Sequence, residues 1–184
     1  MVFRVFSSML FFDRKGIYMN IRLANQNDIQ HILYLMHEAK AFLASQNIDQ
    51  WQNEYPSKTD ILQDLEQKNG YVVCDDTEIV GYVCISFDEE HCYNKINGNW
   101  LSNQKYATLH RVAVQNQKKG KGLAGKMFCF AEQMCKEKGI KSIRIDTEKR
   151  NQLMQRAIEK QGFMYCGVVY LDDGERIAFE KLLP

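Results

Sequence analysis

A glycine-rich turn between residues 112 and 126 constrains this chain more than any other feature. An apolar stretch ends at Val114, a polar turn follows, and an amphipathic segment begins at Leu123. Glycines let the backbone approach a ligand closely, and the free N–H groups at a helix start bind anions. Four lysines add positive charge to the same turn: Lys118, Lys119, Lys121 and Lys126. The pattern therefore predicts a strand, a phosphate-binding turn and a helix, in that order.

Two nucleotide-binding motifs fit these glycines. Gly120-x-Gly122-x-x-Gly125 matches the dinucleotide fingerprint, and Asp146 lies at a suitable distance to meet a ribose hydroxyl. The same glycines nearly match a Walker A loop, but Met127 cannot replace the Ser/Thr hydroxyl that binds magnesium. In both motifs the strand should end just before the first glycine, whereas five polar residues follow Val114 here. The chain after the turn is also too short to complete a doubly wound nucleotide domain.

A third motif lies on the same turn. Gln117-x-x-Gly120-x-Gly122 resembles the Q/R-x-x-G-x-G/A signature of the GNAT superfamily of acyl-CoA N-acyltransferases. Each short motif is weak by itself, so a glycine-rich helix start that binds no ligand is the remaining alternative.

Composition and charge limit the functional classes. With 184 residues the chain is long enough for one domain with a substantial core. Its 24 basic and 23 acidic residues are interspersed and give a net charge of +1, so no overall field recruits nucleic acid. Six cysteines show no C-x-x-C pair and no metal-ligand spacing, which indicates a reducing cytoplasm without disulfides. We therefore expect a cytoplasmic, globular protein without a metal site.

The first 18 residues differ from the rest of the chain. Residues 5–12 are apolar but too short to span a bilayer, which takes about 20 residues. They also lack the cleavage site of a signal peptide. We expect residues 1–18 to be an N-terminal extension outside the core and residues 19–184 to form the domain, with no membrane partner.

Periodicity and turn residues predict the elements of this domain. Strands are expected at 20–24, 70–74, 79–87, 106–114, 140–146, 163–171 and 176–183. Helices are expected at 28–45, 57–65, 123–139 and 151–160. The sequence Asp172-Asp173-Gly174 predicts a hairpin turn between the last two strands. Consecutive antiparallel strands followed by β-α-β predict a mixed sheet flanked by helices.

With this order of elements the resemblance to GNAT acyltransferases extends over residues 20–182. A second family signature appears as Asn151-x-x-Met154 followed by Gly162-Phe163, and Gln50-Trp51 and Tyr55-Pro56 resemble a bacterial subgroup. The resemblance implies an α/β (α+β) fold with a single mixed, mostly antiparallel sheet, a central parallel pair and flanking helices.

The resemblance also implies acetyl-CoA as the cofactor, bound in a gap between the strands at 106–114 and 140–146. The pantetheine amides would pair with the first strand, the pyrophosphate would lie on the glycine turn, and Asn151 would contact the far side of the pantetheine arm. The cofactor-binding residues that it implies are Val112, Ala113, Val114, Gln117, Lys118, Lys119, Gly120, Lys121, Gly122, Leu123, Ala124 and Asn151.

Two catalytic side chains that are frequent in the family are absent here. Thr108 stands where a carboxylate often lies, and Ile158 stands where a tyrosine often protonates the thiolate. His110 shares a strand face with Thr108, Val112 and Val114 by alternation and is a candidate base. The alternative for His110 is a structural role.

Two further residues are candidates for the missing chemistry. Asp146 could orient an amine or His110, or cap a turn. Tyr165 could donate a proton, or be a core tyrosine.

An aromatic set lies in the segments that form the acceptor site of this family. Its members are Trp51, Tyr55, Tyr93, Trp100 and Tyr106. We expect an N-acetyltransferase that moves the acetyl group to a primary amine of a small molecule or protein, by direct attack in a ternary complex. A non-catalytic acyl-CoA sensor and a dinucleotide-binding protein are the alternatives. The sequence leaves homodimer formation open.

Overall fold

The computed structural model describes residues 8–12 and 18–184. Its strands are β1 (Ser8–Phe12), β2 (Tyr18–Leu23), β3 (Gly70–Asp75), β4 (Glu78–Ser86), β5 (Asn97–Gly98), β6 (Ala107–Val114), β7 (Ser142–Thr147), β8 (Met164–Leu171) and β9 (Gly174–Leu182). Its α-helices are α1 (Ile29–Ser45), α2 (Lys58–Glu66), α3 (Leu123–Lys138) and α4 (Gln152–Lys160). Short 3-10 helices are η1 (Gln26–Asp28), η2 (His91–Lys95) and η3 (Asn116–Lys118).

In the part of the chain that the structure describes, all nine strands join one sheet in the order β1-β2-β3-β4-β6-β7-β9-β8-β5. Every pair of neighbours is antiparallel except β6 and β7. The predicted mixed sheet with a central parallel pair is therefore confirmed. The doubly wound parallel sheet of a dinucleotide-binding domain is excluded by the same pairing.

The N-terminal segment contributes an edge strand to this sheet. β1 pairs with β2 from Ser8↔Arg22 to Phe12↔Tyr18. Most of the segment expected to lie outside the core, residues 1–7 and 13–17, is outside the described residues. The boundary at residue 19 stays a prediction.

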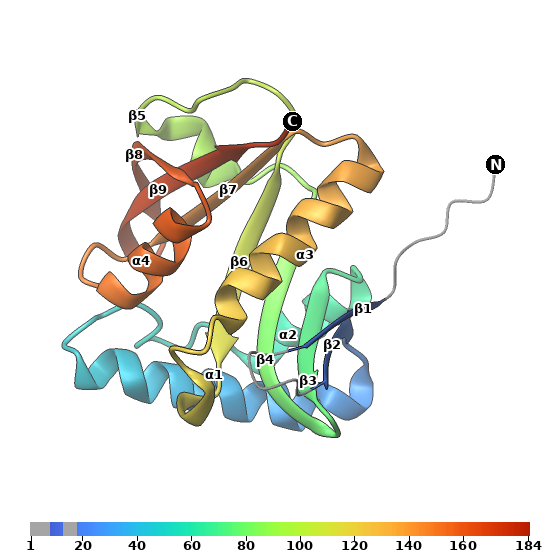
Figure 1. Cartoon of the computed structure of the whole chain (residues 1–184). Helices are drawn as coiled ribbons and strands as arrows, with labels where there is room; N and C mark the ends of the chain where they lie inside the picture. Colours follow the sequence, from blue (N-terminus) through green and yellow to red (C-terminus); the bar gives the residue numbers. More distant parts are fainter. Residues whose placement is uncertain (1–7, 13–17) are drawn as a thin grey trace.

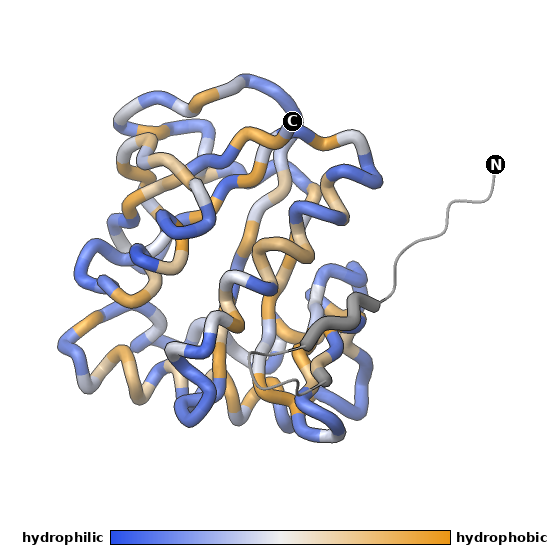
Figure 2. Tube along the Cα trace, in the orientation of Figure 1, coloured by the Kyte–Doolittle hydropathy of each residue, from blue (hydrophilic) through white to orange (hydrophobic). Residues whose placement is uncertain are grey.

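Helices cover both faces of the sheet (Figure 1). α3 and α4 pack on one face over a core that includes Met127, Phe128 and Ile158. α1 and α2 pack on the other face, where Ile32 and Ile61 meet the sheet. The turn between β6 and α3 is hydrophilic along its length (Figure 2).

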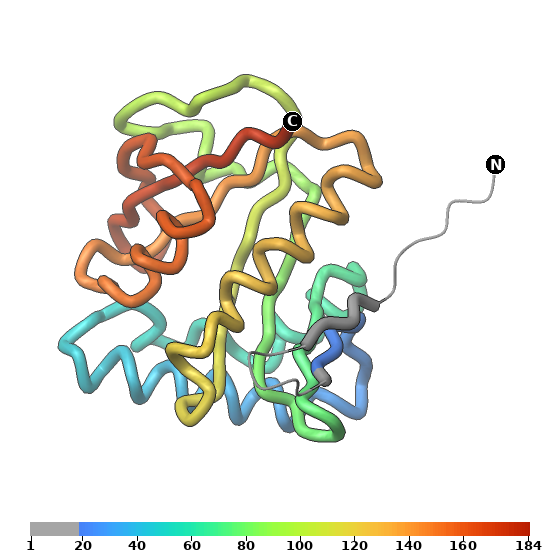
Figure 3. Tube along the Cα trace, in the orientation of Figure 1, coloured from blue at the N-terminus to red at the C-terminus, as the bar shows by residue number. Residues whose placement is uncertain are grey.

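β6 and β7 lie together at one end and diverge toward the other (Figure 3). Their pairing covers only Ala107–Leu109 against Ile143–Ile145. The register of β6 against β4 shifts just beyond this point, where Arg111 has a left-handed φ of 52°. Tyr82 pairs with Ala113 but Cys84 pairs with His110, so β6 carries one extra residue, which is a β-bulge.

Because of the bulge, the side chain of His110 lies on a different face of the sheet from the one that alternation predicts relative to Val112 and Val114. Cys84 and Tyr82, the cross-strand partners of His110 and Ala113, both belong to the cluster on the α1–α2 face. Val112 and Val114 instead pack on the α3 cluster. His110 therefore shares a face with Thr108, as predicted, but the predicted common face with Val112 and Val114 is wrong. An extra residue changes the alternation of a strand, and periodicity cannot detect it.

Candidate active site

A cavity of about 440 Å³ opens where β6 and β7 diverge. Its walls come from α1, β6, the glycine turn, α3, β7 and α4, from residues 50–55 between the first two helices, and from the β8–β9 hairpin. One end lies over the glycine turn and the other over the bulge of β6. Most of the residues predicted to bind a cofactor line it: Val112, Ala113, Val114, Lys118, Lys119, Gly120, Gly122, Leu123, Ala124 and Asn151. Gln117 and Lys121 are not among the lining residues.

The glycine turn presents its backbone to the cavity. Gly120 and Gly122 have φ values of 75° and 83°. Apart from the adjacent residues, no heavy atom of the described chain lies within 4 Å of a Cβ added to either glycine. Gly122 is the N-cap of α3 and offers no side-chain cap to the first N–H groups. An anion bound at this helix start would therefore meet unshielded donors.

Basic side chains surround the same end of the cavity. Lys118 forms an ion pair with Asp75, and Arg156 and Lys160 of α4 line the opposite wall. The ammonium of Lys119 lies 3.3 Å from the ring centroid of Phe42 and has no hydrogen-bond partner among the described residues. Burial lowers the pKa of Lys119 to about 8. The charge of Glu38 opposes this shift but no hydrogen bond joins the two side chains, and a phosphate would supply the missing hydrogen-bond partner.

Two backbone features complete the cofactor end. Beyond Leu109 the edge of β6 that faces β7 has no pairing to β7 in the described residues. The Oδ1 atom of Asn151 accepts a hydrogen bond from the backbone N–H of Met154 at 3.2 Å and caps α4. Its amide nitrogen is not used by this cap, so Asn151 can both fix the helix and reach the cavity.

His110 lines the other end of the cavity and lies beside a carboxylate that the sequence did not reveal. Its Nε2 atom is 3.3 Å from Oε2 of Glu90, which precedes η2. Hydrogen bonding to His110 lowers the pKa of Glu90 to about 2, against the opposing effect of burial. Cys92 donates to the second oxygen of Glu90 at 3.4 Å.

Asp146 is the second carboxylate at this end. Tyr93 donates to its Oδ2 atom at 2.6 Å, and Asp146 lines the cavity from the end of β7. Burial raises the pKa of Asp146, and the hydrogen bond from Tyr93 acts against this shift, followed by the charges of His110 and Arg176. Asp146 has no ion pair with lysine or arginine among the described residues. A carboxyl group with a raised pKa and no paired cation is suited to exchanging a proton or to binding an ammonium group.

The structure divides the predicted aromatic set in two. Trp51 and Tyr55 line the cavity. Trp100 and Tyr106 line a separate depression of about 720 Å³ and enclose the guanidinium of Arg144, whose Cζ lies 4.1 Å and 3.9 Å from their ring centroids. Trp100 and Tyr106 therefore do not line the cavity, because their rings pack on Arg144. Tyr93 is buried beneath Asp146.

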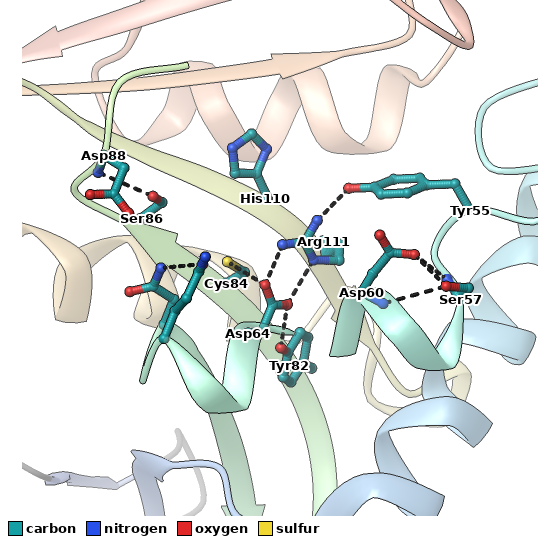
Figure 4. Close-up of polar contacts among 12 residues, drawn as sticks. Tyr55, Ser57, Asp60, Asp64, Tyr82, Cys84, Ser86, Asp88, His110 and Arg111 are labelled. Carbon is teal, nitrogen blue, oxygen red and sulfur yellow. Dashed lines mark hydrogen bonds and ion pairs between the residues drawn. The ribbon is translucent and has the colours of Figure 1, made fainter. Parts of the chain in front are cut away.

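A buried ionic network supports the bulge (Figure 4). Asp64 of α2 is 2% exposed and accepts hydrogen bonds from Arg111, from the Tyr82 hydroxyl at 2.7 Å and from the Cys84 thiol at 3.2 Å. Arg111 also donates to the Tyr55 hydroxyl at 2.6 Å. The ring of His110 points away from Asp64 (Figure 4). Sequence reasoning missed this network, although Asp64 follows Ile61 by three residues and so shares its buried face.

Tyr165 is not brought to the cavity. It lies on β8, is 59% exposed and contacts the ring of Phe179 edge to face. Both expectations for Tyr165, a proton donor at the site and a core tyrosine, disagree with this position. The register of β8 against β9 shifts between Tyr165 and Gly167, so simple alternation does not hold here. Thr108 and Ile158 are fully buried, so neither supplies the missing side chain.

Comparisons with known proteins agree on one family. The family model described as Acetyltransferase (GNAT) family matches residues 33–163. A GNAT-family acetyltransferase structure from Streptococcus agalactiae is 36% identical, with a TM-score of 0.83 over 96% of this chain and 99% of that one. A Listeria monocytogenes GNAT-family acetyltransferase is 21% identical, with a TM-score of 0.74 over 95% of this chain and 100% of that one.

A third structure, yncA, a putative acetyltransferase from Salmonella typhimurium, was solved with its cofactor acetyl-CoA. It is 16% identical, with a TM-score of 0.67 over 90% of this chain and 94% of that one. A search of curated proteins finds no match. Within the described residues, no helix combines the length and the apolar character needed to cross a membrane.

Proposed function

The chain belongs to the GNAT family of acetyltransferases, and we propose that it transfers an acetyl group from acetyl-CoA to a primary amine within a ternary complex. The observation that carries this proposal is the asymmetry of the cavity between β6 and β7. One end offers a glycine turn, an uncapped helix start and basic side chains. The other end offers His110 and Asp146.

The residues at the first end fit acetyl-CoA. Its pyrophosphate suits the backbone of Gly120 and Gly122, and its further phosphate suits the surrounding cations. The free edge of β6 beyond Leu109 suits the amides of the pantetheine arm, which would extend the sheet as a strand does. When bound, acetyl-CoA supplies the acetyl group as a thioester.

The residues at the second end fit the needs of the acceptor. An alkylammonium has a pKa of roughly 10.4 and must lose a proton before it attacks. In this proposal His110 takes that proton and Asp146 orients the amine from β7. A backbone N–H near Val112–Val114 would stabilise the negative charge that develops on the carbonyl oxygen.

Ligand-dependent melting tests the cofactor part. A ligand at about 100 times its Kd adds roughly 2.7 kcal/mol of stability, which raises Tm by roughly 5–10 °C in a domain of this size. Acetyl-CoA should give such a shift, and NAD at the same concentration should give almost none. An equal shift with NAD would contradict the proposal.

Turnover tests the enzymatic part. Wild type and His110→Ala are incubated with acetyl-CoA and a panel of primary amines, and acetylated products are measured by mass spectrometry. His110→Ala should lower kcat by about 10²-fold or more and leave the acetyl-CoA melting shift unchanged. An unaltered kcat in His110→Ala would exclude His110 as the general base. A melting shift without product from any amine would favour a sensor that binds acyl-CoA without catalysis.

A further inference from the structure

The loop before η2 brings a carboxylate to His110 that no family signature in this chain marks. Glu90 is 20 residues away from His110 in the sequence, yet its Oε2 atom lies 3.3 Å from Nε2 of the imidazole. The side chain of His110 is 16% exposed and lines the cavity, whereas that of Glu90 is 33% exposed and is not among the lining residues.

We propose that Glu90 is the positioning residue of His110: it holds the proton of the neutral imidazole on Nε2 and leaves Nδ1 free to accept the proton of the amine. This inference rests on the proposed acetyl transfer. An imidazole has one donor and one acceptor nitrogen when neutral, and a carboxylate can only accept. The nitrogen facing Glu90 must therefore be the donor.

Glu90 is itself held in place from two sides. Its backbone N–H donates to the Tyr106 hydroxyl at 3.1 Å, and its Oε1 atom accepts from the Cys92 thiol at 3.4 Å. A carboxylate fixed by such contacts loses little freedom when it orients its partner.

Two stacked tyrosines extend this support to Asp146. The rings of Tyr93 and Tyr106 are stacked with centroids 6.2 Å apart. Tyr106 binds the backbone of Glu90, and Tyr93 binds the carboxylate of Asp146. The tyrosine pair therefore links the backbone of Glu90 to the carboxylate of Asp146.

Charged groups approach His110 from the loop before η2, from β7 and from β6 itself. Glu90 faces it from the loop before η2, and Asp146 acts on it from β7. Arg111, the next residue of β6, is paired with Asp64. When His110 takes up a proton during turnover, the imidazolium therefore lies beside the carboxylate of Glu90.

The experiment compares Glu90→Gln and Glu90→Asp with Glu89→Gln. Glu89 is the exposed neighbour and contacts Asn94, so Glu89→Gln makes the same chemical change without touching His110. We expect Glu90→Gln to lower kcat by about 10-fold or more and to give a pH profile that differs from that of Glu89→Gln. Glu90→Asp should recover part of kcat, and KM for acetyl-CoA should stay within about 2-fold, because Glu90 does not line the cofactor end.

A spectroscopic measurement reports the positioning directly. ¹⁵N-labelled histidine spectra at a pH where His110 is neutral should show one tautomer, protonated on Nε2, in wild type and Glu89→Gln. Glu90→Gln should show a mixture, and His110→Ala identifies the signal among the four histidines.

The outcomes distinguish failure of the positioning role of Glu90 from failure of the proposed acetyl transfer. Product formation with Glu90→Gln equal to Glu89→Gln, in kcat and in pH profile, would overturn the positioning role and leave the proposed function standing. A wild type that acetylates no amine would overturn the proposed function, and the positioning role would fall with it. A mixed tautomer in the wild type would overturn the positioning role irrespective of turnover.

Discussion

Removing the guanidinium of Arg111 should destabilise the protein far more than removing an exposed cation. In Arg111→Met, Asp64 keeps only the Tyr82 hydroxyl and the Cys84 thiol as donors, although it is 2% exposed. Breaking a buried ion pair by deleting one partner costs about 3–5 kcal/mol, because a charge is left buried without compensation. For a chain of this length that is a fall in Tm of roughly 6–20 °C.

The assay is urea unfolding, with two companion variants that identify the cause. Arg111→Met combined with Asp64→Asn removes the stranded charge but keeps an oxygen that can accept from Tyr82, so it should recover about 2 kcal/mol or more. Lys149→Met deletes a cation that is 68% exposed and 4.0 Å from Glu175, and should change the unfolding free energy little.

The same variant tests the link between the network and the cavity. Arg111 holds a left-handed φ of 52°, a conformation that costs of order 1–3 kcal/mol unless the surroundings impose it. Loss of its contacts should relax the bulge and reduce the acetyl-CoA melting shift as well as stability. A cost of less than about 1 kcal/mol for Arg111→Met, or a double variant no more stable than the single one, would refute the role assigned to the ion pair.

Two further predictions concern the cofactor end. Gly120→Val should abolish the acetyl-CoA melting shift, whereas Gly139→Val, which has a similar φ of 69° and equally open space but lies outside the cavity, should keep it; equal loss in both would show that backbone strain, not the approach to phosphate, matters. Because burial lowers the pKa of Lys119 to about 8, this side chain loses its charge as pH rises through that value, and acetyl-CoA affinity measured by calorimetry should fall from pH 7 to pH 9. Lys119→Arg should flatten this dependence and Lys118→Arg should not; an unchanged slope in Lys119→Arg would exclude Lys119 from phosphate binding.

The elements of the fold were predictable because local signals agree with the tertiary structure. The hairpin turn expected at Asp172-Asp173-Gly174 joins β8 and β9, and the helix start expected at Ser57 is a capping box with Asp60. The short strand β5 and η2 fall between the strands expected at 79–87 and 106–114, where no element is expected, because a two-residue strand leaves no periodic signal.

The cofactor end was more predictable than the acceptor end for a physical reason. A turn that offers backbone N–H groups is encoded by adjacent residues, here the glycines of the turn and the start of α3. The acceptor end is assembled from side chains on separate segments: Tyr55, Asp64, Glu90, His110 and Asp146. Their meeting depends on strand order and register, which no short pattern contains.

The bulge of β6 connects the two ends and explains why one strand serves both. It follows directly after Leu109, where the pairing of β6 with β7 ends, so the backbone beyond this point is left for a ligand to pair with. It also changes the alternation, so that His110 belongs to the face of α1 and α2 while Val112 and Val114 pack toward α3. In a regular strand these three side chains would lie on one face. In the proposed function, His110 would therefore reach the amine from the face of α1 and α2, while the edge of β6 beyond Leu109 stays open to the cofactor. The ion pair of Arg111 with Asp64 stabilises the bulge between these two parts of the strand.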